Sequence, residues 1–90
     1  VTWFRVAGDA GYPAAQLALG RMYLEGRGTA RDPTRGFAWL ALAAAQKFNG
    51  AEEARTAALA ALPPEAVTAA QAEARRLGET RLPKGVALDF

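Results

Sequence analysis

The amino-acid sequence predicts an all-α fold built from α/α helix pairs that repeat along the chain, and three observations support this prediction. Apolar residues recur at three- and four-residue steps, which is the spacing of one helix face. Prolines and glycines separate these segments. A shift of 36 positions aligns Trp3 with Trp39 and Val6 with Leu42. Such units bury their apolar faces by stacking on one another in a solenoid.

The first complete helix pair is expected to follow the end of an earlier helix. Residues 1–10 predict that end, because Gly11 is the residue type most common just after a helix. A helix over 13–25 then begins with Pro13, which suits a first helical turn. The inward stripe of this helix consists of apolar residues at helical spacing, namely Ala15, Ala18, Leu19, Met22 and Tyr23.

The second helix of the pair is expected over 33–46 and is predicted to be buried on two sides. Asp32 supplies an N-cap carboxylate, and Pro33 is a first-turn proline. One face carries Phe37, Leu40, Ala41 and Ala44, and the opposite face carries Trp39, Leu42 and Ala43. A helix that is apolar nearly all round is expected to lie between its partner helix and the next pair.

Two further helices are expected to close the array. The helix over 51–61 directs Ala54, Ala58 and Leu62 inward. Pro63 and Pro64 separate it from a helix over 64–77, whose inward side carries Val67, Ala70, Ala74 and Leu77. The remaining surface of this last helix is polar, as a terminal helix in contact with water requires. We expect Gly78 to end it.

These elements predict one domain over residues 1–78, with a C-terminal tail over 79–90, since 90 residues leave room for a single core. Within the domain, 1–11 is the end of a preceding repeat, 12–48 is a complete repeat and 49–78 forms capping helices. Because the sequence starts at Val1 without a methionine or a leader, it is expected to be a piece of a longer protein.

Composition argues against two classes of partner. The net charge is only +2 and the basic residues are spread along the chain, so no nucleic acid partner is expected. The longest apolar run, from Phe37 to Ala45, has nine residues, whereas a membrane-spanning helix needs about 20. No membrane insertion is therefore expected.

The residues for most common enzyme chemistry are missing. The sequence contains no histidine, cysteine or serine, so the usual nucleophile arrangements and the best metal ligands cannot form. Glu52 and Glu53 are adjacent on a helix and point in different directions, as solvated surface residues do. The segment 26–28 is no phosphate loop, because it follows a helix and lacks the Gly-Lys-Ser/Thr ending. We expect no enzyme activity, no catalytic residue, no cofactor and no metal.

Three linked motifs carry a family resemblance. Residues 15–23 read Ala-Gln-Leu-Ala-Leu-Gly-Arg-Met-Tyr, residues 26–32 read Gly-Arg-Gly-Thr-Ala-Arg-Asp, and Trp39, Ala43 and Ala44 follow. They resemble the Sel1-like repeat, a relative of the tetratricopeptide repeat. Its helices read Ala-Gln-x-x-Leu-Gly-x-x-Tyr and Ala-x-x-Trp-x-x-x-Ala-Ala, and its linker reads Gly-x-Gly-x-x-x-Asp. Gly36 stands where the family prefers alanine, a departure expected to weaken the second helix slightly.

The resemblance implies structural roles for its signature residues. We expect Gly20 to let a neighbouring helix approach, and Gly26 and Gly28 to adopt the backbone angles of a tight turn. The full signature is Ala15, Leu19, Gly20, Tyr23, Gly26, Gly28, Asp32, Trp39, Ala43 and Ala44. For function, the resemblance implies a scaffold or adaptor for protein complexes, including complexes at the bacterial cell envelope and in signalling.

The helix over 13–25 carries the expected partner site. Leu17, Gly20, Arg21 and Leu24 lie opposite its inward stripe, so they are expected either to bind a partner or, as we favour, to pack against an upstream repeat. The arginines at 21, 27, 31 and 35 could meet an acidic partner, but a solvated edge that pairs with Glu25 and Asp32 is favoured.

The tail offers a second apolar surface. Val86, Leu88 and Phe90 alternate and could lie as an extended strip in a groove. Self-association is possible through this strip or through the truncated end of the repeat.

The predicted function is therefore a scaffold or adaptor module that binds a peptide or protein partner. Two alternatives remain open: a structural C-terminal cap of a larger repeat protein, and a non-catalytic accessory domain of a larger enzyme. The alanine- and arginine-rich composition fits a bacterial source. Both the cytoplasm and the periplasm are compatible with it, and the partner's identity is left open.

Overall fold

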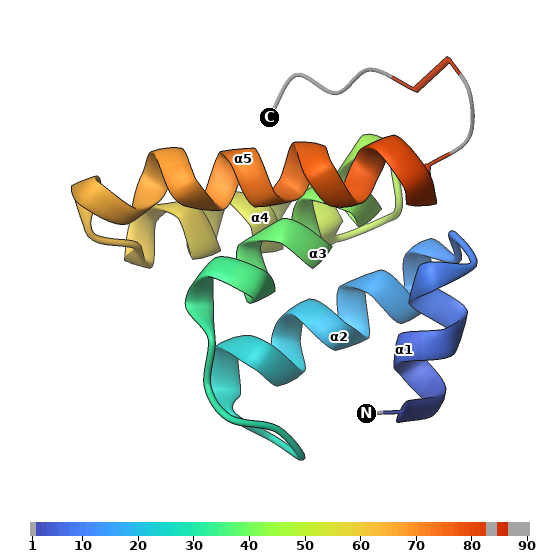
Figure 1. Cartoon of the computed structure of the whole chain (residues 1–90), viewed down its shortest axis with the longest axis horizontal. Helices are drawn as coiled ribbons and strands as arrows, with labels where there is room; N and C mark the ends of the chain where they lie inside the picture. Colours follow the sequence, from blue (N-terminus) through green and yellow to red (C-terminus); the bar gives the residue numbers. More distant parts are fainter. Residues whose placement is uncertain (1, 83–84, 87–90) are drawn as a thin grey trace.

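The computed structural model describes residues 2–82 and 85–86 of the chain. All regular structure in these residues is helical (Figure 1). The helices are α1 (Thr2–Asp9), α2 (Pro13–Glu25), α3 (Pro33–Ala45), α4 (Ala51–Ala61) and α5 (Pro64–Arg81). The all-α prediction is confirmed. The expected bounds agree with these to within about a residue, apart from the end of α5.

Helix α3 lies at the centre of the molecule. It packs against α2, α4 and α5 (Figure 1). Helix α1 packs against α2. Every residue from Gly36 to Ala44 is buried, which confirms that α3 is covered on both sides. The sequence explains this burial, because a helix that is apolar all round is shielded from water only when neighbouring helices cover each of its faces.

Prolines and one carboxylate fix where the helices begin. Pro13, Pro33 and Pro64 each occupy the first turn, where no backbone N–H is needed. Asp32 caps α3, since its carboxylate Oδ1 accepts a hydrogen bond from the backbone N–H of Arg35 at 3.1 Å. Between α2 and α3, Gly26 and Gly28 have φ of +71° and +74°, as the linker motif predicted. The turn therefore depends on glycine at both positions.

A pair of glycines sets the distance between α2 and α3. A Cβ on Gly20 would lie 2.6 Å from Cγ of Leu40 and 2.9 Å from the carbonyl oxygen of Gly36. A Cβ on Gly36 would lie 2.7 Å from Cγ of Leu24 and 3.0 Å from the carbonyl oxygen of Gly20. The close approach expected at Gly20 is confirmed. The view of Gly36 as a slight weakness was incomplete, because the same crossing requires a glycine there.

A buried amide network joins the first three helices. Gln16 is fully buried, and its Nε2 donates a hydrogen bond to the carbonyl oxygen of Gly8 at 3.1 Å. Gln46 Nε2 donates to Gln16 Oε1 at 2.9 Å and to the carbonyl oxygen of Gly11 at 3.0 Å. The amide of Gln16 is thus satisfied on both sides, which a buried polar group needs. The network links α1 and the end of α3 through α2.

The predicted end of the last helix at Gly78 was wrong, because α5 continues to Arg81. Gly78 is buried inside the helix, and its carbonyl oxygen accepts the backbone N–H of Leu82 at 3.1 Å. Arg81 Nε also donates to Asp9 Oδ1 at 2.7 Å, a contact between the last and the first helix. These tertiary contacts outweigh the low helix propensity of one glycine. Of the apolar tail strip, Leu88 and Phe90 lie outside the described residues, and Val86 is half-buried.

Candidate functional site

The four residues expected to bind a partner do not share one exposed face. Gly20 is buried against Leu40 and Gly36, so it cannot contact a partner, and this part of the expectation is corrected. Leu17 and Leu24 are half-buried and pack against the chain's own apolar core. Each side chain is thus partly covered within this chain and partly exposed. Arg21 is exposed.

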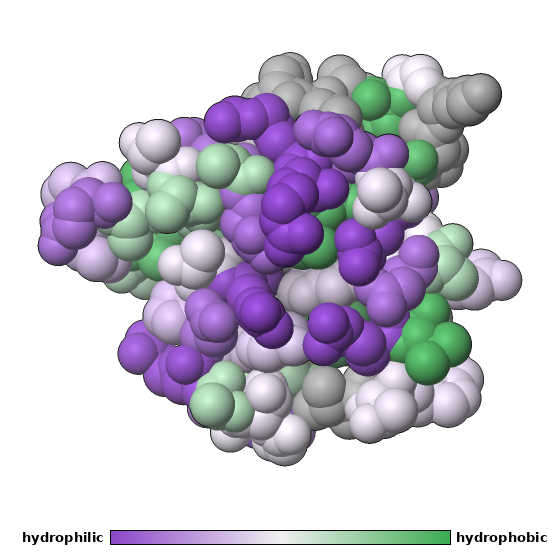
Figure 2. Space-filling view, viewed as in Figure 1, coloured by the Kyte–Doolittle hydropathy of each residue, from purple (hydrophilic) through white to green (hydrophobic). Residues whose placement is uncertain are grey.

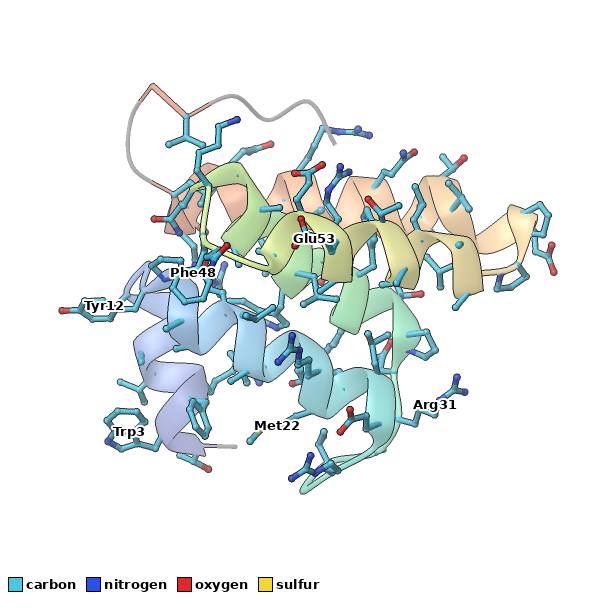
Figure 3. All side chains as sticks on the ribbon, turned by 180° about the vertical axis from the view of Figure 1, so that it is seen from behind. Trp3, Tyr12, Met22, Arg31, Phe48 and Glu53 are labelled. Carbon is cyan, nitrogen blue, oxygen red and sulfur yellow. The ribbon has the colours of Figure 1, made fainter. Side chains whose placement is uncertain are left out.

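Arg21 and Leu24 instead line a groove between α2 and α4. We call it the α2–α4 groove; its volume is about 430 Å³ and its lining residues are Arg21, Leu24, Arg31, Leu40, Ala54, Ala57, Ala58 and Ala61. Figure 3 shows the molecule from the α4 side, with Arg31 at one end of this region. Leu40 of α3 contributes to the lining between the two flanking helices. Two of the four expected residues therefore belong to one concave surface.

Alanines create the space in the groove. Ala54, Ala57, Ala58 and Ala61 occupy positions i, i+3, i+4 and i+7, which lie on a single helix face. Their methyl groups leave open volume where longer side chains would reach toward α2. Ala57 and Ala61 are exposed, so this part of the wall meets water. The groove therefore offers an apolar wall of small residues facing Leu24.

Two arginines supply the charge of the groove. Arg31 Nε donates a hydrogen bond to the carbonyl oxygen of Leu24 at 3.1 Å, which holds this side chain against the end of α2. Arg21 makes no hydrogen bond or ion pair with any residue that the structure describes. The other two arginines of the sequence cluster are paired as expected, Arg27 with Glu25 at 3.1 Å and Arg35 with Asp32 at 3.6 Å. The rim is thus positively charged, with one unpaired guanidinium.

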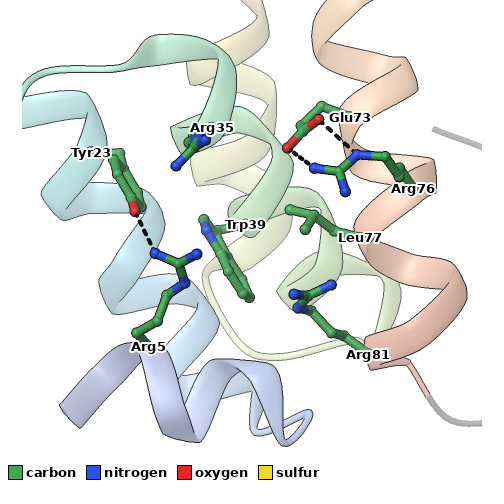
Figure 4. A pocket seen from close by; sticks show the side chains of 8 residues that line it. All are labelled: Arg5, Tyr23, Arg35, Trp39, Glu73, Arg76, Leu77 and Arg81. Atoms are coloured by element: carbon green, nitrogen blue, oxygen red, sulfur yellow. Dashed lines mark hydrogen bonds and ion pairs between the residues drawn. The ribbon is translucent and has the colours of Figure 1, made fainter. Parts of the chain in front are cut away.

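A second, more polar hollow lies on the other side of α3. Its volume is about 150 Å³, and it is lined by Arg5, Tyr23, Arg35, Trp39, Glu73, Arg76, Leu77 and Arg81 (Figure 4). We call it the arginine hollow. Figure 2 shows hydrophilic side chains gathered at the centre of the corresponding face. Sequence reasoning missed this hollow, because its residues come from four helices and no local spacing connects them.

Contacts around the arginine hollow are mostly ionic. Arg76 donates two hydrogen bonds to the Glu73 carboxylate, at 3.2 and 2.6 Å. These hydrogen bonds, together with the charge of Glu73, raise the pKa of Arg76. Glu73 and Arg76 thus form an ion pair in the wall of the hollow. Arg81 lies over the Trp39 ring, 5.8 Å from its centroid, in a cation–π contact.

Neither concave surface has the components of a metal site. No group of three or more His, Cys, Asp or Glu side chains able to hold a metal ion occurs among the described residues. Glu52 and Glu53 are both exposed on α4, and Glu52 pairs with Arg55. The two surfaces differ in what they can bind: the α2–α4 groove suits apolar side chains, and the arginine hollow suits polar or anionic groups.

The helices themselves are too short or too polar for a bilayer. Within residues 2–82 and 85–86, no helix combines the length and the apolar character that crossing a membrane would require.

The family signature coincides with the structural framework. Ala15, Leu19, Tyr23, Trp39, Ala43 and Ala44 are buried. Gly20 lies at the helix crossing, Gly26 and Gly28 form the turn, and Asp32 caps α3. Tyr23 and Trp39 additionally line the arginine hollow, which their place in the repeat alone did not indicate.

Comparison with known proteins agrees with this framework. The family model described as Sel1 repeat matches residues 13–48, which comprise α2, the linker, α3 and the turn after it. The comparisons with curated proteins and with solved structures gave no match. Sel1 repeats generally mediate protein–protein interactions and generally act as non-catalytic scaffolds. The chain therefore contains a Sel1-like repeat at residues 13–48.

Proposed function

We propose that this chain is a non-catalytic interaction module that holds a segment of a partner protein in the α2–α4 groove. The observation that carries the proposal is the combination of an apolar alanine wall with the unpaired charge of Arg21 on the same concave surface. Repeats of this family generally bind protein partners, which supports a protein ligand over a small molecule.

The chemistry of the groove selects one kind of segment. Side chains of leucine or phenylalanine size can fill the space above the alanines and exclude water from Leu24, Ala57 and Ala61. An aspartate or glutamate on the same segment can then pair with Arg21. We propose an amphipathic helix with acidic residues beside its apolar stripe as the ligand, because helices commonly bind in such grooves through anchors at helical spacing.

A peptide selection tests this proposal and does not require the partner to be identified first. A phage-displayed library of helical peptides, randomised at surface positions, is selected on the immobilised chain. Peptides that are enriched are then synthesised and titrated against the wild type and two variants. Ala57→Arg fills the groove, and Ala60→Arg makes the same change at an exposed α4 position that does not line it.

The proposal predicts that enriched peptides combine leucine or phenylalanine with aspartate or glutamate. Ala57→Arg should weaken their binding by roughly tenfold or more, because truncating or blocking a central contact generally reduces the binding free energy by at least about 1–2 kcal/mol. Ala60→Arg should leave the dissociation constant within about twofold, as changes outside an interface do. Enriched peptides that bind both variants equally well would contradict the proposal, and so would a selection that enriches nothing.

A second function is favoured by exposed apolar residues on α1 and in the turn that follows it, which we call the α1 face. Trp3, Val6 and Tyr12 are 75%, 65% and 64% exposed, and Figure 3 shows Trp3 and Tyr12 pointing away from the rest of the molecule. Trp3 aligns with Trp39, which is only 3% exposed because neighbouring helices cover it. We propose that another helical repeat packs on the α1 face, so that residues 1–78 serve as the closing end of a longer array.

Light scattering over a range of protein concentrations tests this second proposal. If the α1 face is a packing surface, the isolated chain should self-associate at high concentration, because apolar patches left open tend to bind one another. The double variant Trp3→Asp, Val6→Asp should remain monomeric. The control Ala60→Asp, Ala69→Asp adds the same charge at exposed positions and should still associate. A monomer at all concentrations for the unchanged chain would contradict the proposal.

A further inference from the structure

The arginine hollow carries an inference that does not depend on the groove. The two surfaces lie on different sides of α3: Leu40 lines the groove, and Trp39 lines the hollow. At about 150 Å³, the hollow is many times larger than the ~10–15 Å³ needed by one water molecule, so it can hold a small polar group. Its occupant has to match the charges and the hydrogen-bond donors that surround it.

The charge of the hollow is positive. Four guanidinium groups and one carboxylate line it. Arg76 is paired with Glu73, Arg81 with Asp9 at 2.7 Å, and Arg35 with Asp32 at 3.6 Å. Arg5 has no carboxylate partner among the residues that the structure describes. An excess of one positive charge therefore remains after every ion pair has been taken into account.

Two nearly buried side chains also direct unused donors at this space. Trp39 is 3% exposed, and its indole N–H has no acceptor in the described part of the chain. Tyr23 is 5% exposed; its hydroxyl oxygen accepts a hydrogen bond from Arg5 Nη1 at 3.4 Å, but its own proton has no acceptor there either. Figure 4 shows the indole nitrogen on the edge of the ring toward Arg35, and the Tyr23 hydroxyl toward Arg5.

A group from outside the chain can accept hydrogen bonds from these donors. No fully buried side-chain nitrogen or oxygen of the described residues lacks a hydrogen bond, so the unpaired indole N–H reaches open space. Trp39 lines the hollow, and this is the space that its nitrogen meets. Water can accept a hydrogen bond from this donor, and a ligand with an acceptor atom can replace that water. The site thus favours a ligand that only accepts hydrogen bonds.

We propose that the arginine hollow binds an oxyanion group, either a carboxylate or a phosphate. Such a group accepts hydrogen bonds from the Trp39 indole N–H, the Tyr23 hydroxyl and the Arg5 guanidinium at once. Charge-assisted hydrogen bonds of this type are stronger than neutral ones. Glu73 does not oppose the anion strongly, because both of its oxygens accept hydrogen bonds from Arg76. The residues come from α1, α2 and α3, so binding also ties these helices together.

Two-dimensional ¹⁵N NMR tests the proposal through the indole N–H itself. Sodium phosphate and sodium acetate are titrated separately into the labelled chain, with sodium chloride at matched ionic strength as the reference. Trp3→Phe assigns the two indole cross-peaks. Arg5→Gln and Tyr23→Phe each remove one donor, and Arg27→Gln removes the same charge from the exposed linker as a control.

The proposal predicts a saturable shift of the Trp39 indole cross-peak with at least one oxyanion. Arg5→Gln should weaken binding by roughly tenfold, because hydrogen bonds to charged groups contribute about 1.5–3 kcal/mol. Arg27→Gln should change it by less than about twofold, since long-range charge is screened by salt. Saturation by phosphate alone assigns the site to phosphate groups, and saturation by acetate alone or by both includes carboxylates. A shift that never saturates, or one that Arg5→Gln leaves unchanged, would overturn the proposal.

Discussion

Gly20 and Gly36 face each other where α2 crosses α3, and neither position has room for a side chain. A Cβ on Gly20 would lie 2.9 Å from the carbonyl oxygen of Gly36, and a Cβ on Gly36 would lie 3.0 Å from that of Gly20. Both clashes involve backbone atoms, which cannot rotate away as a side chain can. The crossing distance of the repeat's two helices is therefore set by this pair.

Gly20→Ala and Gly36→Ala should each destabilise the chain. The higher helix propensity of alanine would stabilise the fold by about 1 kcal/mol. Overpacking a tight contact, however, generally lowers the free energy of unfolding by about 1–3 kcal/mol or more. We expect a net loss in the free energy of unfolding, measured by urea denaturation followed by circular dichroism. Glu53→Ala, at an exposed position on α4, is the control and should stay within about 0.5 kcal/mol of the wild type. A stabilised Gly36→Ala variant would show that α2 and α3 are not in close contact.

Gln16→Leu should destabilise the chain although it makes a buried position more apolar. The change leaves the carbonyl oxygen of Gly8 without its donor and removes the acceptor of Gln46. The expected loss is about 1–3 kcal/mol, measured as the free energy of unfolding. Gln71→Leu, at a half-buried position without such a network, is the matched control and should have a smaller effect. Equal effects of the two changes would argue against the network.

Asp32→Ala should lower the melting temperature, while Asp32→Asn should largely preserve it. The Asp32 side chain accepts a hydrogen bond from the backbone N–H of Arg35, and asparagine can accept the same bond. Loss of an N-cap generally lowers the free energy of unfolding by about 1 kcal/mol. Differential scanning calorimetry of the two variants separates the cap from the ion pair with Arg35. If both variants lose the same stability, the charge of Asp32 matters and the cap does not.

The ion pair between Asp9 and Arg81 should make a small, salt-dependent contribution. It joins α1 to α5 at 2.7 Å, but the side chains are 42% and 24% exposed. A double-mutant cycle with Asp9→Asn and Arg81→Met should give a coupling energy of about 0.5–1 kcal/mol, which decreases as salt is added. A coupling energy near zero at low salt would show that α5 reaches Arg81 for other reasons, such as the burial of Leu77.

Local chemistry explains why most of the fold could be predicted. The helix starts follow from Pro13, Pro33 and Pro64, and the central position of α3 follows from its apolar residues on all sides. The end of α5 could not be predicted in this way. Its last turn is held by Asp9 and Trp39, and no local pattern connects these residues to Arg81.

The candidate sites were less predictable for the same reason. Arg21 and Leu24 were expected to bind a partner, but α4 supplies half of the groove that they line. Leu17 was expected on an open face, whereas it packs against the core. The arginine hollow is built across α1, α2, α3 and α5, so only the arrangement of the helices in space reveals it. A single sequence shows which residues are on one helix face but not which faces meet.

Chemical-shift mapping of a bound peptide tests the central claim, that the α2–α4 groove holds a partner segment. An acidic amphipathic peptide from the library selection is titrated into the ¹⁵N-labelled chain. The account predicts that the perturbed amides cluster around Arg21, Leu24, Ala57 and Ala61, with little change near Trp3 on α1. Perturbations centred on α1 or on the outer side of α5, with the groove residues unchanged, would contradict it.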